Sequence, residues 1–325
     1  MKEIHTVCGL LDPEKLGKTL IHEHFICGHP GWEGDQTIAP FNRELCVQKG
    51  IRMAEEIRKY GVHSVVEGTP NDLGRNPEVL KEISEKGGIN IICSTGYFNE
   101  AEGGSRYFRT LSQFGDGASM IYELIKKEVN EGIRGTSIKA GILKLATGKG
   151  TITKYEEMFF KVAARVSKED KVPIYTHTEE GTMGLEQAEL LLSEGADPKL
   201  IMIGHACGNP TMAYLKPILK KGVYIGFDRF GIEGVFGTPT DAQREGTLID
   251  LLKDGYESQI MISHDWMNHW LSRPIVDEIV PMVLPRWKPT HIFEDILPNL
   301  RKSGIAEEQI TTILVDNPRK YFSGQ

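Results

Sequence analysis

Short apolar runs recur along the whole chain and predict a series of β-strands. Each run is rich in Val, Ile and Leu and is apolar on nearly every residue, rather than on alternate residues. This pattern is typical of parallel strands that are covered on both faces. The predicted strands span residues 18–24, 63–69, 89–97, 141–147, 172–178, 200–206, 222–228 and 259–265.

Segments with helical periodicity alternate with these strands. Some begin at a capping residue or end at a glycine, as Asn76-Pro77 and Glu194-Gly195 illustrate. This repeated order, without a low-complexity linker, predicts the α/β fold class, and within it a (β/α)₈ TIM barrel that forms a single domain over residues 1–325. Residues 1–15 are expected to form a short N-terminal hairpin extension. The predicted helices span residues 43–60, 76–86, 118–131, 154–170, 184–194, 211–220 and 244–254.

A doubly wound sheet is the main alternative to the barrel. That fold places a glycine-rich phosphate loop directly after its first strand. Here the first predicted strand ends in His22-Glu23-His24 instead. The barrel is therefore the favoured architecture.

Composition and charge narrow the range of partners. The chain has 40% hydrophobic and 26% charged residues, as globular proteins do, and its net charge of −7 argues against a nucleic-acid or anionic-membrane partner. No apolar run approaches the roughly 18 residues of a membrane helix, and the first residues lack the layout of a secretory signal. Five cysteines without a CxxC pair fit reduced thiols. These features predict a cytoplasmic protein that acts on a small molecule.

Five of the predicted strands end in, or contain, residue types that bind metals. In a parallel barrel the carboxyl ends of the strands converge on one face, where such folds place their chemistry. One histidine at one strand end usually packs at the rim of the core, but its repetition along the chain favours a shared site. The candidate ligands are His22, His24, Lys144, His177, His205 and Asp265.

The spacing of these residues indicates two metal ions. Side chains two apart on a strand face the same way, so His22 and His24 can share one ion. His177 and His205 end neighbouring strands and can hold a second ion, while Asp265 on the last strand comes next to the first strand. Imidazole and carboxylate together suit Zn, Mn, Co, Fe or Ni.

Lys144 lies inside an apolar strand and allows two interpretations. Taken alone, it is a lysine whose stem is buried and whose ammonium reaches the surface. If the amine is buried, its pKa falls, and a neutral amine can react with CO₂ to give a carbamate, which is a bidentate carboxylate. Such a carbamate would bridge two cations.

Seven segments together resemble the amidohydrolase superfamily, and within it the phosphotriesterase-like branch that includes the phosphotriesterase-like lactonases. The resemblance covers nearly the whole chain, and the combination of segments is specific although each one alone is weak. The segments are Leu20–His24, Lys139–Lys144, Thr176–Thr178, Ile203–His205, Gly226–Gly231, Ile262–Asp265 and Asp316–Phe322.

The resemblance implies a binuclear metal centre, for which zinc is the first expectation and Mn, Co or Fe are alternatives. The more buried ion would take His22, His24, the carbamate of Lys144 and Asp265. The more exposed ion would take the same carbamate with His177 and His205. A hydroxide would bridge the ions and attack the substrate, with Asp265 as the catalytic residue that moves its proton. The family also implies a homodimer.

The resemblance leaves the substrate open. A lactone, such as a sugar lactone or an acyl-homoserine lactone, is the first expectation, and a phosphotriester or phosphodiester cleaved at the same site is the second. A catalytically inactive barrel that only binds a ligand is a third possibility. Retention of all the ligand-type residues argues against this last one.

The loops after the strands supply the expected substrate contacts. Lactonase members carry a tyrosine just past the third strand, where this chain has Tyr97 followed by Phe98, so the phenol is either lost or displaced by one residue. His264 should face away from the metals because it adjoins Asp265. Aromatic residues of these loops, including Trp270 and Trp287, either wall the pocket or cap the core. The predicted substrate-binding residues are Tyr97, Phe98, Arg229, Phe230, Trp266 and His269.

Overall fold

The fold is built around one curled parallel sheet, seen in a computed structural model that describes residues 3–103, 106–235 and 237–325. Over these ranges the sheet has nine strands in the order β10-β9-β8-β7-β6-β5-β4-β3-β11. This arrangement confirms the predicted α/β class with parallel strands. The strands are β3 (Lys18–His24), β4 (Val62–Glu67), β5 (Asn90–Gly96), β6 (Ile142–Thr147), β7 (Ile174–Thr178), β8 (Ile201–Gly204), β9 (Tyr224–Phe227), β10 (Ile260–Ile262) and β11 (Trp266–Met267).

The last strand predicted from the sequence, 259–265, is interrupted before its end. Asp265 has a φ of 56°, in the left-handed region, so the extended backbone of β10 does not continue through it. The chain resumes as β11, which pairs in parallel with β3 through Glu23 and His24. The backbone N–H of Asp265 donates to the carbonyl of His22 at 3.1 Å. The first and last strands of the sheet therefore lie side by side.

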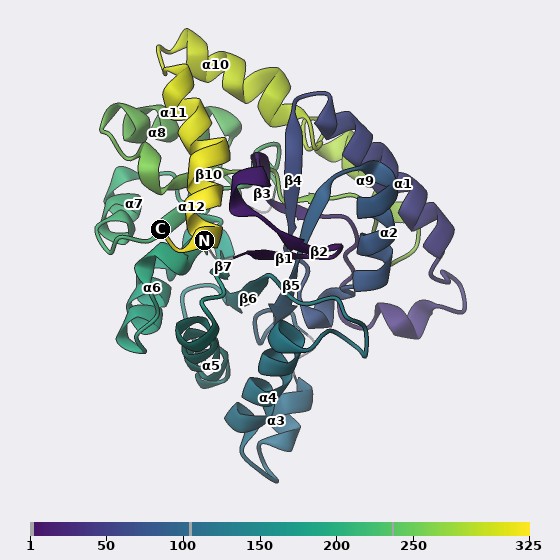
Figure 1. The fold of residues 1–325 in the computed structure, drawn as a ribbon. Helices are drawn as coiled ribbons and strands as arrows, with labels where there is room; N and C mark the ends of the chain where they lie inside the picture. Colours follow the sequence, from purple (N-terminus) through teal and green to yellow (C-terminus); the bar gives the residue numbers. More distant parts are fainter. Residues whose placement is uncertain (1–2, 104–105, 236) are drawn as a thin grey trace.

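The helices lie around the outside of the curled sheet (Figure 1). Local signals fix several of them; for example, the Thr153 side chain and Glu156 form a capping box at the start of α5. No helix within the described ranges is both long and apolar enough to cross a membrane. The α-helices are α1 (Arg43–Arg58), α2 (Pro77–Gly87), α3 (Arg106–Leu111), α4 (Gly117–Asn130), α5 (Lys154–Asp170), α6 (Gly184–Ser193), α7 (Met212–Leu219), α8 (Asp241–Lys253), α9 (Ile275–Val283), α10 (Leu297–Lys302), α11 (Glu307–Thr311) and α12 (Asn317–Ser323).

The N-terminal segment forms two short strands, β1 (Ile4–Thr6) and β2 (Gly9–Leu11), which pair antiparallel. Residues 1 and 2 of the predicted hairpin extension lie outside the described part of the chain. Ile4 belongs to an apolar cluster that also contains Tyr321 from α12, so both ends of the chain contribute to it. This cluster fills one end of the space inside the sheet.

The same apolar cluster supports the polar residues above it. Ile142 of β6 and Tyr175 of β7 are fully buried members of the cluster. Lys144 and His177 come two residues later on the same two strands and therefore face the same way. The alternation of side chains thus places a polar layer over an apolar layer.

Candidate metal centre

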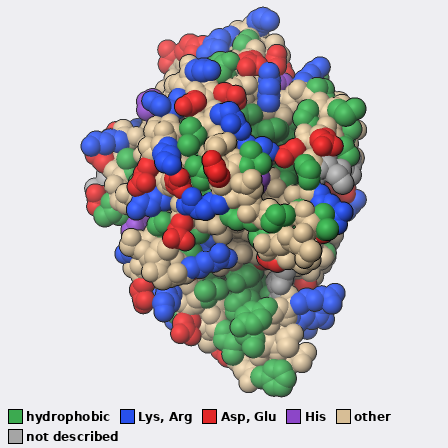
Figure 2. Space-filling model, turned by 90° about the vertical axis from the view of Figure 1, so that its right-hand side faces the viewer, with side chains coloured by type: hydrophobic (Ala, Val, Ile, Leu, Met, Phe, Trp, Pro, Cys, Tyr) green, Lys and Arg blue, Asp and Glu red, His purple; other side chains and the backbone are tan. Residues whose placement is uncertain are grey.

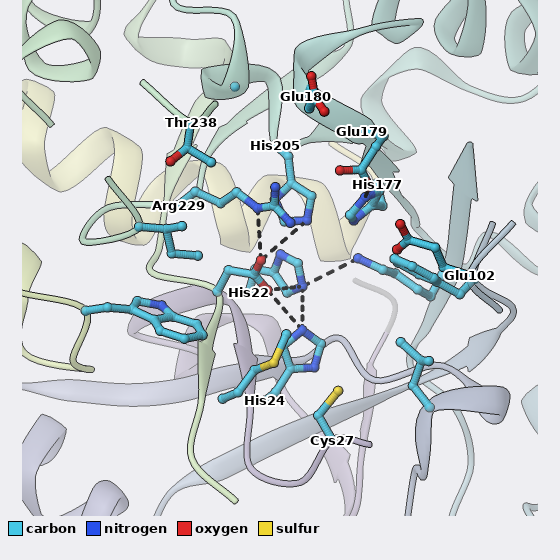
Figure 3. A pocket seen from close by; sticks show the side chains of 18 of the residues that line it. His22, His24, Cys27, Glu102, His177, Glu179, Glu180, His205, Arg229 and Thr238 are labelled. Carbon is cyan, nitrogen blue, oxygen red and sulfur yellow. Dashed lines mark hydrogen bonds and ion pairs between the residues drawn. The ribbon is translucent and has the colours of Figure 1, made fainter. Parts of the chain in front are cut away.

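A cavity of about 520 Å³ opens where the parallel strands end. It collects side chains from strands that are far apart in the sequence, and Figure 3 shows them pointing toward one another. The loops after the strands form its outer wall. The lining includes all six predicted metal ligands, His22, His24, Lys144, His177, His205 and Asp265.

His22, His24 and Asp265 converge most closely. Nε2 of His22 lies 3.1 Å from Nε2 of His24. Oδ1 of Asp265 lies 3.3 Å from the first of these nitrogens and 3.0 Å from the second. Two imidazole nitrogens and a carboxylate oxygen within this distance, all buried, are suited to hold a metal ion. These two nitrogens and one oxygen therefore fit the more buried transition-metal ion that is expected from the sequence.

His177 and His205 lie on the neighbouring side of the cavity. Their rings meet edge to face, with centroids 4.5 Å apart. Nε2 of His205 lies 3.7 Å from Oδ2 of Asp265, which also accepts a 3.0 Å hydrogen bond from Nε of Arg229. Asp265 is therefore shared between the two groups of histidines.

Burial keeps His22, His177 and His205 neutral. It lowers the pKa of His22 to about 3, and the charge of Lys144 acts in the same direction. It also lowers the pKa of His177 and takes the pKa of His205 well below its usual value. At neutral pH these rings are uncharged, so their lone pairs are available to a cation.

The amine of Lys144 is buried beside the histidines. Its side chain is about 2% exposed, so it does not reach the surface as an extended lysine would. Nζ lies 3.4 Å from Nε2 of His22 and 3.9 Å from the centroid of the Tyr175 ring. Burial lowers the pKa of Lys144 to about 7, although Asp265 and Asp228 oppose the shift. The neutral form of the amine is therefore accessible near neutral pH.

Asp228 was not among the predicted site residues, yet it orients two of the histidines. Oδ1 lies 3.1 Å from Nδ1 of His205, and Oδ2 lies 3.4 Å from Nδ1 of His22. The carboxylate also accepts hydrogen bonds from the backbone N–H of His205 and from the hydroxyl of Tyr175. Because Asp228 occupies both Nδ1 atoms, the Nε2 atoms face the cavity. Its place just after β9, where other strands end in ligand-type residues, could have identified it.

Glu23, between the two histidines of β3, points to the opposite face of the sheet and holds the last strand in place. It accepts hydrogen bonds from Oγ of Ser263 at 2.7 Å, Nδ1 of His264 at 2.7 Å and the backbone N–H of Trp266 at 2.8 Å. His264 therefore faces away from Asp265, as the alternation along the strand predicts. These contacts fix the backbone on both sides of Asp265.

Two of the six predicted substrate contacts line the cavity. Phe98 packs edge to face on His177, with ring centroids 4.7 Å apart, and Arg229 reaches Asp265. Trp287 also lines the cavity. Sequence reasoning did not single out Cys27, Glu102, Glu179 or Met267, which line it as well. Cys27 and Glu102 lie outside the strands, where no periodicity indicates the direction of a side chain, whereas Met267 belongs to β11 and Glu179 directly follows β7.

The other four predicted contacts are absent from the lining of this cavity. Tyr97 follows β5 on the side opposite to Phe98 and packs against Phe108 and Phe159. Phe230 is fully buried in the core. Trp266 and His269 instead line two other surface hollows; the one at Trp266 lies against α1 and α9. Of the two aromatic residues past β5, Phe98 therefore occupies the cavity wall, and the phenol of Tyr97 lies elsewhere.

The chain is similar to known hydrolases, which agrees with a candidate metal centre at this position. The model of the "Phosphotriesterase family" matches residues 2–322. An aryldialkylphosphatase of Saccharolobus solfataricus is 36% identical over 96% of this chain and 97% of its own length. The organophosphorus hydrolase of Deinococcus radiodurans has a TM-score of 0.96 with 47% identity, covering 98% of this chain and 96% of its own.

A mutant of a phosphotriesterase-like lactonase from the same organism has a TM-score of 0.96 with 46% identity, over 98% of this chain and 99% of its own. Both the family match and these relatives span nearly the whole chain. The prediction made from the sequence is confirmed: the chain is a hydrolase that belongs to the phosphotriesterase family.

Proposed function

We propose that this hydrolase opens lactones at a two-metal centre held by His22, His24, the carbamate of Lys144, His177, His205 and Asp265. The observation that carries the proposal is the convergence of the His22 and His24 Nε2 atoms with Asp265 beside a buried amine. Zinc is the first candidate for both ions, with manganese, cobalt or iron as alternatives. The curled sheet would be a closed (β/α)₈ barrel, a single domain over residues 1–325.

Lys144, Asp265 and Arg229 would each have a separate role in the reaction. When bound, the ions supply Lewis-acid polarisation and activation of water. The neutral amine of Lys144 forms an N–C bond to CO₂ and releases one proton, which gives a carboxylate between the two groups of histidines. Asp265 takes the proton of the attacking water and passes it to the leaving alkoxide. Arg229 holds Asp265 through its 3.0 Å hydrogen bond.

The shape of the cavity supports a small substrate with an apolar part. Phe98, Met267 and Trp287 give it an apolar wall, and its volume of about 520 Å³ lies in the range of small-molecule sites. The relative described as a phosphotriesterase-like lactonase favours a lactone. The relatives described as an aryldialkylphosphatase and an organophosphorus hydrolase favour the second candidate, a phosphotriester or phosphodiester.

A substrate panel separates these candidates. We expect metal-loaded protein to hydrolyse lactones faster than nitrophenyl phosphotriesters. We expect Phe98→Tyr to raise lactone turnover by about 10-fold, because a hydroxyl added near His177 can donate to the developing oxyanion. Steady-state rates on both substrate types measure this.

Tyr97→Phe is the matched control, because its ring packs against Phe108 and Phe159, and we expect it to leave both rates unchanged. If Phe98→Tyr changes nothing and phosphoester turnover dominates in the parent, the phosphoesterase assignment replaces the lactonase one. Metal-loaded protein that hydrolyses neither class would support the inactive binding barrel.

We also propose that the protein forms a homodimer. Figure 2 shows apolar side chains gathered on the lower part of one face, at the end of the molecule where Figure 1 places α3 and α4. In this segment Tyr107 is 65% exposed and Phe114 is 83% exposed. Exposed apolar patches of this kind commonly mark protein interfaces.

Phe114→Asp is expected to shift the protein from dimer to monomer, because the interface would have to bury an unpaired charge. Sedimentation velocity at several concentrations measures the shift. Leu10→Asp, which changes an exposed apolar residue of β2, is the control and should leave the dimer intact. A parent protein that sediments as a monomer contradicts the proposal.

A further inference from the structure

Glu179 contacts His177. Asp228 orients the neighbouring ligand His205 but does not contact His177. Nε2 of His177 donates to Oε2 of Glu179 at 2.9 Å. The His177 side chain is about 5% exposed and that of Glu179 about 25% exposed, so the carboxylate lies at the cavity wall. Figure 3 shows Glu179 next to the ring of His177, with Glu180 farther out.

The end of β7 directs Glu179 toward the ring, because Thr178 is extended, with φ −107° and ψ 128°, and side chains two apart on a strand face the same way. The chain turns away directly after Glu179. Glu180 has a φ of 49° and Gly181 a φ of 62°, two consecutive residues in the left-handed region that turn the chain sharply. A Cβ on Gly181 would lie 2.3 Å from the backbone N of Asn209, so this turn packs closely against the segment after β8. The same turn sends the Glu180 side chain outward to an ion pair with Lys149. Adjacent glutamates therefore have different partners.

Each of the other three candidate histidines is held through Nδ1. Nδ1 of His24 lies 2.6 Å from Oγ1 of Thr69. Nδ1 of His22 and Nδ1 of His205 share the Asp228 carboxylate. His177 differs because its held nitrogen is Nε2, which leaves Nδ1 as the nitrogen with a free lone pair.

We propose that Glu179 is a positioning residue that fixes the ring and tautomer of His177, so that Nδ1 serves as the ligand of the more exposed metal ion. This inference rests on the proposed two-metal function. A carboxylate that accepts from a ligand histidine orients the ring and raises its basicity, and its removal weakens metal binding by about 10–100-fold. Glu179 acts on one of the two ions only, because its hydrogen bond reaches none of the other three histidines.

The test measures metal release rather than turnover. Parent, Glu179→Ala, Glu179→Gln and Glu180→Gln proteins are loaded with zinc and mixed with excess chromogenic chelator. We expect two ions per chain in the parent, released in two phases. Glu179→Ala should accelerate one phase by about 10–100-fold and leave the other unchanged. Glu179→Gln should give a smaller acceleration, because its amide oxygen still accepts the hydrogen bond.

Glu180→Gln is the matched control and should release both ions as the parent does, because its partner is Lys149. Parent-like release by Glu179→Ala overturns the role of Glu179, and so does an equal acceleration of both phases. A lower kcat/KM with parent-like metal release overturns it as well, since Glu179 would then contact the substrate. A parent that holds one ion or none contradicts the two-metal proposal itself, which separates the two failures.

Discussion

Replacement of Lys144 by alanine is expected to remove at least one of the two ions and to lower hydrolysis by more than about 100-fold. This exceeds the 10–100-fold that loss of an outer partner costs, because Lys144 would supply an atom to each ion. A short carboxylic acid added with metal should restore part of the activity, since it can enter the space left by the side chain. Metal analysis and steady-state rates measure both effects.

Lys149→Ala is the control for this experiment. Lys149 follows β6 closely but has an exposed side chain that pairs with Glu180. We expect this variant to keep both ions and parent-like rates. An unmodified amine found by mass analysis and by density in a metal-loaded crystal would contradict the carbamate, even if Lys144→Ala is inactive.

Asp265→Asn is expected to slow lactone hydrolysis by about 10²–10⁴-fold, because an amide cannot take the proton of the attacking water. The same variant should lose less activity on a nitrophenyl phosphotriester. Nitrophenolate leaves without protonation, whereas the alkoxide of an opened lactone needs a proton. The ratio of the two rate losses, measured on metal-loaded protein, is the readout.

The interpretation of the Asp265→Asn rates depends on how much metal the variant retains. Asparagine keeps an oxygen at the position of Oδ1, which lies 3.0 Å from Nε2 of His24, so the variant should still bind metal. Equal losses on both substrates with full metal content would contradict the proton-transfer role. Loss of metal together with both activities would show that the carboxylate of Asp265 is needed to hold the metal.

The strands could be located from the sequence because their apolar runs are nearly continuous. The prediction for residues 18–24 matches the bounds of β3. The prediction for 259–265 was too long, because β10 ends at Ile262 and the left-handed φ of Asp265 separates it from β11. Such a conformation at a residue other than glycine leaves no trace in the hydrophobic pattern.

Four of the candidate ligands lie on strands, which fix the direction of every second side chain: His22, His24, Lys144 and His177. His205 and Asp265 follow their strands with left-handed φ values of 55° and 56°, so the strand pattern predicts where these two residues lie but not where their side chains point. The substrate contacts were predicted less accurately, because no regular alternation sets the direction of side chains in loops. Phe98 lines the cavity, whereas Trp266 lines a separate hollow beside α1 and α9. Glu179 follows His177 by two residues across an extended Thr178, so the strand alternation could have identified it.

The closest pair of candidate ligands joins the two ends of the sheet. His24 and Asp265 are 241 residues apart in the chain, so this part of the site forms only after β11 has paired with β3. Contacts of such long sequence separation form late and slowly during folding. Metal loading should therefore follow completion of the fold, and an ion bound there would cross-link the first and last strands. Resistance to unfolding would then depend on the metal supply.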